Sequence, residues 1–140
     1  MNIVHISVSN NLLPPEGYGG TERVVHWLSK AQMSMGHEVH IICPEASTTE
    51  ANTIPISLWC SEEEAYQQSY QNILSLKPDI VHDHTFSQLF RLRHPDQIAI
   101  STHHNERFES VSNTVYPSRA DAESNDSSTF VYHGLDLDEY

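Results

Sequence analysis

The fold is decided by residues 1–44, which read MNIVHISVSNNLLPPEGYGGTERVVHWLSKAQMSMGHEVHIICP. An apolar run of strand length covers 3–8 and is followed by a polar loop over 9–20 that is rich in proline and glycine. Apolar residues then recur at helical spacing over 21–35, and a second apolar run covers 39–43. Strand, loop, helix and strand in this order predict a βαβ unit, which implies a parallel sheet with a right-handed crossover.

The helix of this unit has two sequence signals at its ends. Thr21 is expected to cap the amino terminus, because its hydroxyl can accept a hydrogen bond from a free backbone N–H. Gly36 is expected to close the carboxyl terminus in a left-handed conformation.

Strands and helices keep alternating after the first unit. Further strands are expected at 54–59, 79–83, 98–102 and 130–132, and helices at 62–76 and around 86–92. Pro55 cannot donate a ladder hydrogen bond, so the third strand should lie near a sheet edge. Residues 118–128 are polar and acidic, which predicts a solvated loop or a disordered link. The pattern predicts an α/β fold: a three-layer, Rossmann-like domain with a mostly parallel sheet.

The composition fits one domain and excludes several classes of protein. The chain has 140 residues, enough to bury a core without metal or disulfide staples. Its 7 Lys and Arg residues stand against 19 Asp and Glu residues, and this net charge of −12 excludes nucleic acid as a partner. Cys43 and Cys60 are too few and too far apart for a disulfide framework or a zinc motif. We find no signal peptide and no apolar membrane span, and we expect a cytoplasmic protein.

A glycine-rich loop precedes the first helix. Gly19 and Gly20 lie where the free N–H groups and the dipole of a helix favour an anion such as a phosphate or a diphosphate. A simple tight turn explains the pair equally well. The loop is not a Walker loop, because no Gly-Lys-Ser/Thr follows, and it is not a dinucleotide fingerprint, because Glu22 stands where a third glycine would be. A nicotinamide cofactor is a minor alternative, with Glu45 placed to bind a ribose.

The chain has ten histidines, which raises the question of a metal site. His82 and His84 can point to the same side of a strand, whereas His103 and His104 point apart. A three-ligand site is possible, but this spacing does not support it. Structural or surface roles are the simplest interpretation for His26, His37, His40 and His94.

Four short segments stand out by their order along the chain. They read YGGTERVV at 18–25, KPDIVHDH at 77–84, ISTHHN at 100–105 and VYHGLD at 131–136. Together with IVHIS in the first strand and GHEV after the first helix, they resemble the amino-terminal domain of a family-4 glycosyltransferase. The resemblance covers nearly the whole chain and implies that the α/β domain is one half of a GT-B fold.

The resemblance also implies a site. By the matching segments, His104 is the histidine of the catalytic site beside the transferred sugar, to which we assign a positioning role and not that of a general base. His103 is the second choice for this position. The other residues that the resemblance places at the cleft, as substrate-binding residues, are Gly19, Gly20, Thr21, Arg23 and His84.

The activity implied by the resemblance is transfer of a sugar from a nucleotide-diphosphate sugar to an acceptor with retention, without a cofactor or metal. Residues 1–134 would form the acceptor-side domain, and 135–140 would begin the hinge to a nucleotide-sugar-binding domain. The chain has no two glutamates with the spacing of the family's donor motif, so we expect it to be inactive alone. An acidic chain repels an anionic donor, and Arg23 and Arg107 are the nearest candidate cations.

Other functions stay open from the sequence. The main alternative is a non-catalytic, Rossmann-like domain that binds an anion at Gly19 and Gly20 or serves as half of an assembly, so self-association is possible on this interpretation. A degenerate glycosyltransferase is a further alternative. Expected partners are a nucleotide sugar, an acceptor and a donor domain.

Overall fold

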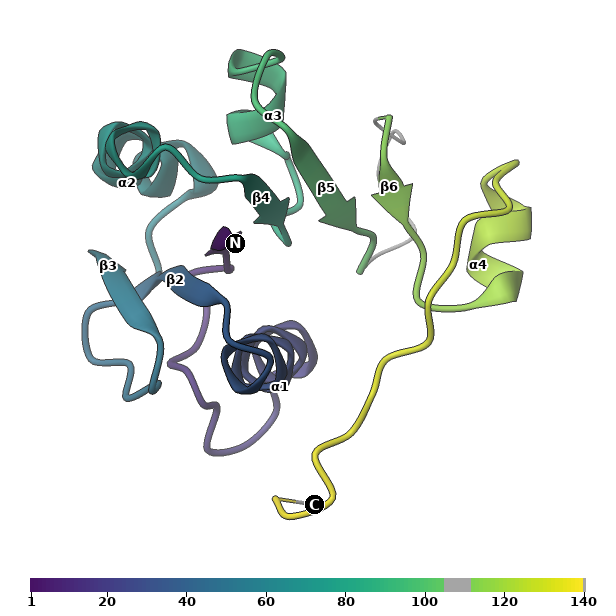
Figure 1. Ribbon diagram of the computed structural model, residues 1–140, viewed down its shortest axis with the longest axis horizontal. Coiled ribbons are helices and arrows are strands. Elements are labelled where there is room, and N and C mark those ends of the chain that lie inside the picture. Colours follow the sequence, from purple (N-terminus) through teal and green to yellow (C-terminus); the bar gives the residue numbers. More distant parts are fainter. Residues whose placement is uncertain (105–111, 140) are drawn as a thin grey trace.

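The computed structural model describes residues 1–104 and 112–139. Figure 1 shows strands and helices in alternation along most of the chain. The strands are β1 (Asn2–Ile6), β2 (Glu38–Pro44), β3 (Asn52–Ile56), β4 (Ile80–Asp83), β5 (Ala99–Thr102) and β6 (Thr114–Val115). The helices are α1 (Gly20–Ser34), α2 (Glu62–Leu76), α3 (Leu89–Arg93) and α4 (Arg119–Ser124).

The six strands form one sheet in the order β3-β2-β1-β4-β5-β6, and every neighbouring pair is parallel. The predicted α/β, Rossmann-like fold is therefore confirmed, and the strand with Pro55 is an edge strand as expected. The strands β1 and β4 lie side by side at the centre, with β2 and β3 beyond β1 and with β5 and β6 beyond β4. In open parallel sheets, ligands bind outside the carboxyl ends of the strands at such a switch point.

The two faces of the sheet are covered by different helices (Figure 1). One face packs against α2 and α3 through a mainly aliphatic core, in which Val4, Ile73 and Val81 are almost completely buried. The other face packs against α1 through a smaller cluster around Val25 and Ile41. Because side chains alternate along a strand, neighbouring positions of β1 and β4 serve opposite faces.

Local chemistry explains the helix ends. Ser61 accepts from the backbone N–H of Glu64, whose carboxylate accepts from the Ser61 N–H, so α2 begins with a capping box. Gly36 follows α1 with φ of 85°, as predicted. The expected Thr21 cap is wrong: α1 already begins at Gly20, and no side chain caps it.

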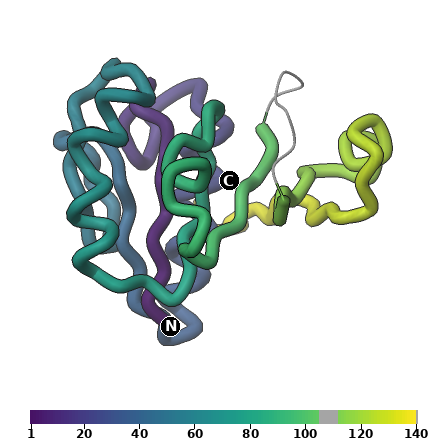
Figure 2. Tube along the Cα trace, turned by 90° about the horizontal axis from the view of Figure 1, so that it is seen from above, coloured from purple at the N-terminus to yellow at the C-terminus, as the bar shows by residue number. Residues whose placement is uncertain are grey.

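The carboxyl-terminal part departs most from the prediction. The polar stretch 118–128 is not loop throughout, because Ser118 caps the short helix α4 through the backbone N–H of Asp121, and Ala122 is buried beneath it. The strand expected at 130–132 is reduced to one bridge between Phe130 and Tyr116. Figure 2 shows the α4 segment extending away from the sheet.

Asn105 and Arg107, two residues of the expected site region, lie outside the described residues. Within the residues that the structure does describe, no helix has the length and apolar character needed to cross a membrane.

Candidate functional site

A pocket of about 370 Å³ lies at the sheet edge where β1, β4 and β5 end. The loop after β1, the start of α1 and the residues after β5 contribute its walls. Its polar lining comes from Asn10, Asn11, Thr21, Glu22, His104 and His133. The predicted site residues Gly19, Gly20, Thr21 and His104 are thus brought together from distant parts of the sequence.

The two glycines of the loop have different reasons to be glycine. A Cβ atom on Gly19 would lie 2.7 Å from Cβ of Pro15, so the loop backbone packs too closely for any side chain there. A Cβ atom on Gly20 would meet nothing within 4 Å. Gly19 therefore shapes the loop, and Gly20 leaves the pocket wall bare for a ligand.

A buried carboxylate lies at the helix end of the pocket. Glu22 is only 3% exposed, and Asn11 Nδ2 donates a 3.0 Å hydrogen bond to its Oε1. A carboxylate in the first turn already interacts with the positive end of the α1 dipole. None of the described residues lining the pocket is lysine or arginine. The lining therefore suits a neutral, hydroxyl-bearing group better than a phosphate.

His104 forms the opposite wall. Its Nε2 lies 3.0 Å from Nδ1 of His84, and its ring stacks against His133 with centroids 5.6 Å apart. Burial lowers the pKa of His104 to about 4, and the nearby His133 and His103 add to this lowering. At neutral pH, His104 is therefore an uncharged hydrogen-bonding group.

His84 lies behind His104 and has no exposed surface. Its Nε2 is 3.1 Å from Nδ1 of His5, and burial holds its pKa well below the ordinary value. A residue without exposed surface cannot touch a ligand, so His84 can act on the pocket only through His104.

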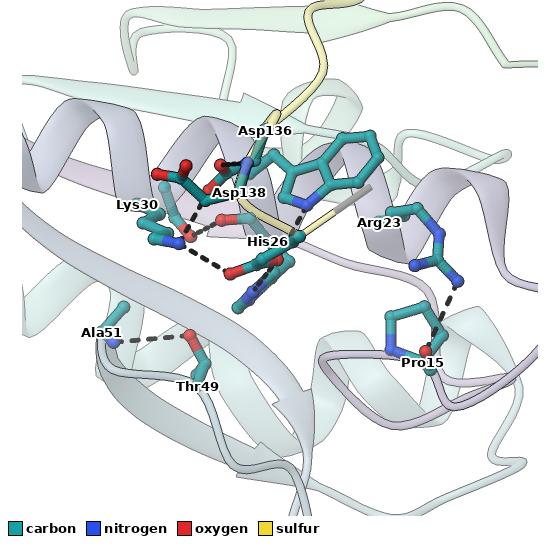
Figure 3. Close-up of polar contacts among 11 residues, drawn as sticks. Pro15, Arg23, His26, Lys30, Thr49, Ala51, Asp136 and Asp138 are labelled. Atoms are coloured by element: carbon teal, nitrogen blue, oxygen red, sulfur yellow. Dashed lines mark hydrogen bonds and ion pairs between the residues drawn. The ribbon is translucent and has the colours of Figure 1, made fainter.

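The remaining predicted residues lie outside the pocket. His103 is buried on the other side of the chain, with its ring 5.0 Å from Tyr116, in keeping with the expectation that His103 and His104 point apart. Arg23 donates through Nη2 to the carbonyl of Gly17 at 2.8 Å, and its guanidinium lies 5.8 Å from the Trp27 ring centroid. Figure 3 shows Arg23 pointing toward Pro15, so it supports the loop from outside.

Three buried histidines have the proximity, but not the geometry, of a metal centre. One nitrogen from each of His5, His82 and His84 lies within 4.8 Å of the other two. An imidazole binds a metal in its ring plane, but His82 and His84 stack face to face with centroids 4.0 Å apart and 27° between planes. Stacked rings aim poorly at a common ion, and the facing nitrogens of His5 and His84 already share a hydrogen bond. We therefore interpret these three histidines as a hydrogen-bonded cluster and not as a metal site.

A second, larger cavity of about 660 Å³ lies between α1 and residues 131–137. Lys30 Nζ donates to Asp136 at 2.7 Å and to Glu139 at 2.6 Å, which holds this segment along α1 (Figure 3). These hydrogen bonds raise the pKa of Lys30 and lower that of Asp136. His133 of the same segment lines the smaller pocket.

Sequence reasoning missed three residues of this region. They are His5, Gln32 and His133. Two of them had a readable signal: Ile-Val-His occurs in both β1 and β4, which would have paired His5 with His82, and Gln32 falls one helical turn after Leu28 on the buried side of α1.

Comparisons with known proteins give a family and a fold for the chain. The family model for Glycosyltransferase Family 4 matches residues 18–136. A solved structure, that of AviGT4, a glycosyltransferase involved in avilamycin A biosynthesis, is similar with a TM-score of 0.77 and 21% identity, and the match covers 99% of this chain and 43% of that one. The catalytic domain of Starch Synthase IV from Arabidopsis thaliana matches with a TM-score of 0.47 and 17% identity, over 98% of this chain and 38% of that one.

The chain spans less than half the length of both solved structures. A comparison with curated protein sequences gave no match.

Proposed function

Because this chain belongs to glycosyltransferase family 4, we propose that it is the acceptor-side domain of an enzyme that transfers a sugar from a nucleotide-diphosphate sugar to an acceptor with retention. The observation that carries the proposal is the pocket at the β1/β4 switch point. It combines the bare backbone at Gly20 with His104, and both belong to segments that match the family.

The chemistry of the pocket fits the acceptor side of this reaction. Glycosyl transfer requires that the leaving diphosphate be stabilised and that sugar and acceptor be held in line. The described pocket residues offer the acceptor atoms of Glu22 and His104, which can bind hydroxyl groups. Positive charge for the diphosphate would come from a donor domain. On this proposal the chain is inactive by itself and needs neither cofactor nor metal.

The domain boundary belongs to the same proposal. Residues 1–134 would form the acceptor-side unit, and 135–140 would lead into the donor domain. The contacts of Lys30 with Asp136 and Glu139 support a defined path for the chain as it leaves the sheet. A cytoplasmic location and self-association stay predictions.

The alternative function, anion binding by a non-catalytic domain, is less well supported. Its expected site is the loop at Gly19 and Gly20, but the carboxylate of Glu22 lies beside that loop. Like charges in one partly buried pocket repel. A phosphate there would need a cation that the described lining does not supply.

NMR titration of the ¹⁵N-labelled chain tests the proposal. The probes are methyl α-glucoside, methyl α-mannoside, methyl α-galactoside, UDP-glucose and inorganic pyrophosphate. At least one glycoside is expected to shift the Gly20 and His104 resonances, with an affinity in the millimolar range. His104→Ala should abolish this shift, whereas His37→Ala should not, because His37 follows the carboxyl end of α1 and does not line the pocket. Binding of pyrophosphate at Gly20 with no response to any glycoside would contradict the proposal and favour the anion-binding alternative.

A further inference from the structure

Four side chains form one hydrogen-bonded row that ends at the pocket. Gln32 Oε1 lies 2.7 Å from His5 Nε2, and His5 Nδ1 lies 3.1 Å from His84 Nε2. The row continues from His84 Nδ1 to His104 Nε2 at 3.0 Å. It runs from α1 through the interior to the pocket wall.

The fold explains why these four residues meet. His5 and His82 are register partners on β1 and β4, and His84 follows two positions later on the same side. His104 comes after β5, the next strand, and Gln32 faces the strands from α1. The row therefore crosses the switch point of the sheet at right angles to the strands.

The contact with Gln32 sets the direction of every hydrogen bond in the row. A carbonyl oxygen can only accept, so His5 Nε2 carries a proton and donates it to Gln32 Oε1. A neutral imidazole has one N–H, so His5 Nδ1 accepts from His84 Nε2. By the same step, His84 Nδ1 accepts from His104 Nε2. The His104 ring then has no proton on Nδ1.

The surroundings keep the rings neutral, as this order of protons requires. His5 and His84 are completely buried, and burial lowers the pKa of His5 to about 4. His82 stacks on His84, and His133 stacks on His104, so a charge on any ring would repel a charge on its neighbour. Within the described part of the chain, the hydrogen bonds that form the row involve no carboxylate.

We propose that Gln32, His5 and His84 are positioning residues that fix the tautomer of His104 and leave its Nδ1 as a hydrogen-bond acceptor at the pocket. The role of this acceptor rests on the function proposed above. It favours a ligand that brings a hydroxyl donor to His104 and disfavours an ether or phosphate oxygen, which can only accept. The tautomer itself can be tested without any ligand.

Substitutions at residue 32 test this proposal because they remove or reverse the first hydrogen bond of the row. Gln32→Met keeps the length of the side chain but removes the acceptor. Gln32→Lys supplies only donors, so every proton in the row should move to the other nitrogen. Gln71→Lys is the matched control, since Gln71 is exposed on α2 and its side chain donates a hydrogen bond to the Tyr70 hydroxyl.

The measurement is long-range ¹H–¹⁵N correlation NMR of the histidine rings at pH 7.5, where a protonated and a bare ring nitrogen have well-separated ¹⁵N shifts. In the native chain, His5, His84 and His104 should all be Nε2–H tautomers. Gln71→Lys should leave His104 unchanged. Gln32→Met should give a mixture of tautomers, and Gln32→Lys should place the His104 proton on Nδ1.

Two results would overturn the proposal. The first is an Nδ1–H tautomer of His104 in the native chain, which needs no variant and is decisive even if a variant fails to fold. The second is an unchanged His104 in folded Gln32→Lys. Since no ligand is present, either result leaves the proposed glycosyltransferase function standing, whereas failure of the glycoside titration would leave the tautomer result standing.

Discussion

The same strands present side chains of different chemistry to the two faces of the sheet. Toward α2, β1 and β4 present Val4 and Val81, which are fully buried among aliphatic side chains. Toward α1, the neighbouring positions are His5 and His82, which are also buried but polar. Burial of an apolar side chain stabilises the fold, whereas burial of an imidazole is tolerated only when its nitrogens are hydrogen-bonded. The aliphatic face therefore holds the fold together, and we interpret the histidine face as the one built for binding.

Acid should break this comparison most strongly, because the buried histidines of the histidine face respond to it together. The pKa values of His5, His82 and His84 are lowered in the folded chain, chiefly by burial, so the unfolded chain takes up protons more readily. Their contribution to stability is present above pH 6.5 and is lost as the pH falls. Each additional proton that the unfolded chain binds lowers the free energy of unfolding by about 1.4 kcal/mol for every pH unit of acidification. Urea denaturation should show the free energy of unfolding decreasing steeply between pH 6.5 and 4.5.

Asp83 offsets part of this loss. Burial raises its pKa to about 6, so the folded chain takes up this proton before the unfolded chain does. Asp83→Asn removes the offset and keeps the Oδ1 that accepts from Thr85. The pH dependence should become steeper by about 1.4 kcal/mol per pH unit near pH 5. If the pH dependence of the free energy of unfolding were unchanged or shallower, this role of Asp83 would be contradicted.

Ile73→Ala should lower stability more than any other single substitution proposed for the two faces. Ile73 of α2 is 1% exposed and fills the aliphatic face, so its truncation should lower the free energy of unfolding by about 2–5 kcal/mol. Leu74→Ala is the control, because Leu74 is 40% exposed on the same helix. Glycoside binding by the folded fraction should stay the same. A loss of binding larger than the loss of folded protein would show that the two faces are not separate in function.

His84→Phe should have a smaller effect on stability and a larger one on binding. The phenyl ring fills the space but leaves His5 Nδ1 and His104 Nε2 without partners. An unpaired buried polar group costs about 1–3 kcal/mol. Denaturation and glycoside titration of the same samples separate the two effects. Full retention of glycoside binding would contradict a role for His84 in the pocket.

Lys30→Ala should have the smallest effect. Its ion pairs with Asp136 and Glu139 are partly exposed to solvent, so the midpoint of thermal unfolding should change little. The NMR signals of residues 131–139 should nevertheless shift, because those contacts hold the segment along α1. Lys77→Ala serves as the control, and unshifted signals in Lys30→Ala would contradict the arrangement in Figure 3.

The sequence predicted most of the sheet because the signals there are local. Apolar runs and turn residues identified five of the strand regions and the two long helices, to within a few residues. The carboxyl-terminal part was predicted less well: Val115 and Phe130 belong to short segments whose pairing depends on contacts far along the chain. Ser118 and Asp121 are the capping signal that would have revealed α4.

For the site, family-like segments led to His104 and the glycine loop, which do line one pocket. They did not show that His84 lies behind His104 or that Arg23 faces away, since both depend on side-chain direction. Helical spacing places Gln32 on the buried side of α1, but its hydrogen bond with His5 depends on tertiary contact.

The most direct test of the central claim compares a bound glycoside with its per-O-methylated form, which has lost every hydroxyl donor. The claim is that the pocket binds a neutral, hydroxyl-bearing group through an acceptor on His104. We predict that methylation weakens binding at least about tenfold, the equivalent of one lost hydrogen bond of about 1.4 kcal/mol. Equal binding of the two forms, with the same shift of the His104 resonance, would contradict the claim.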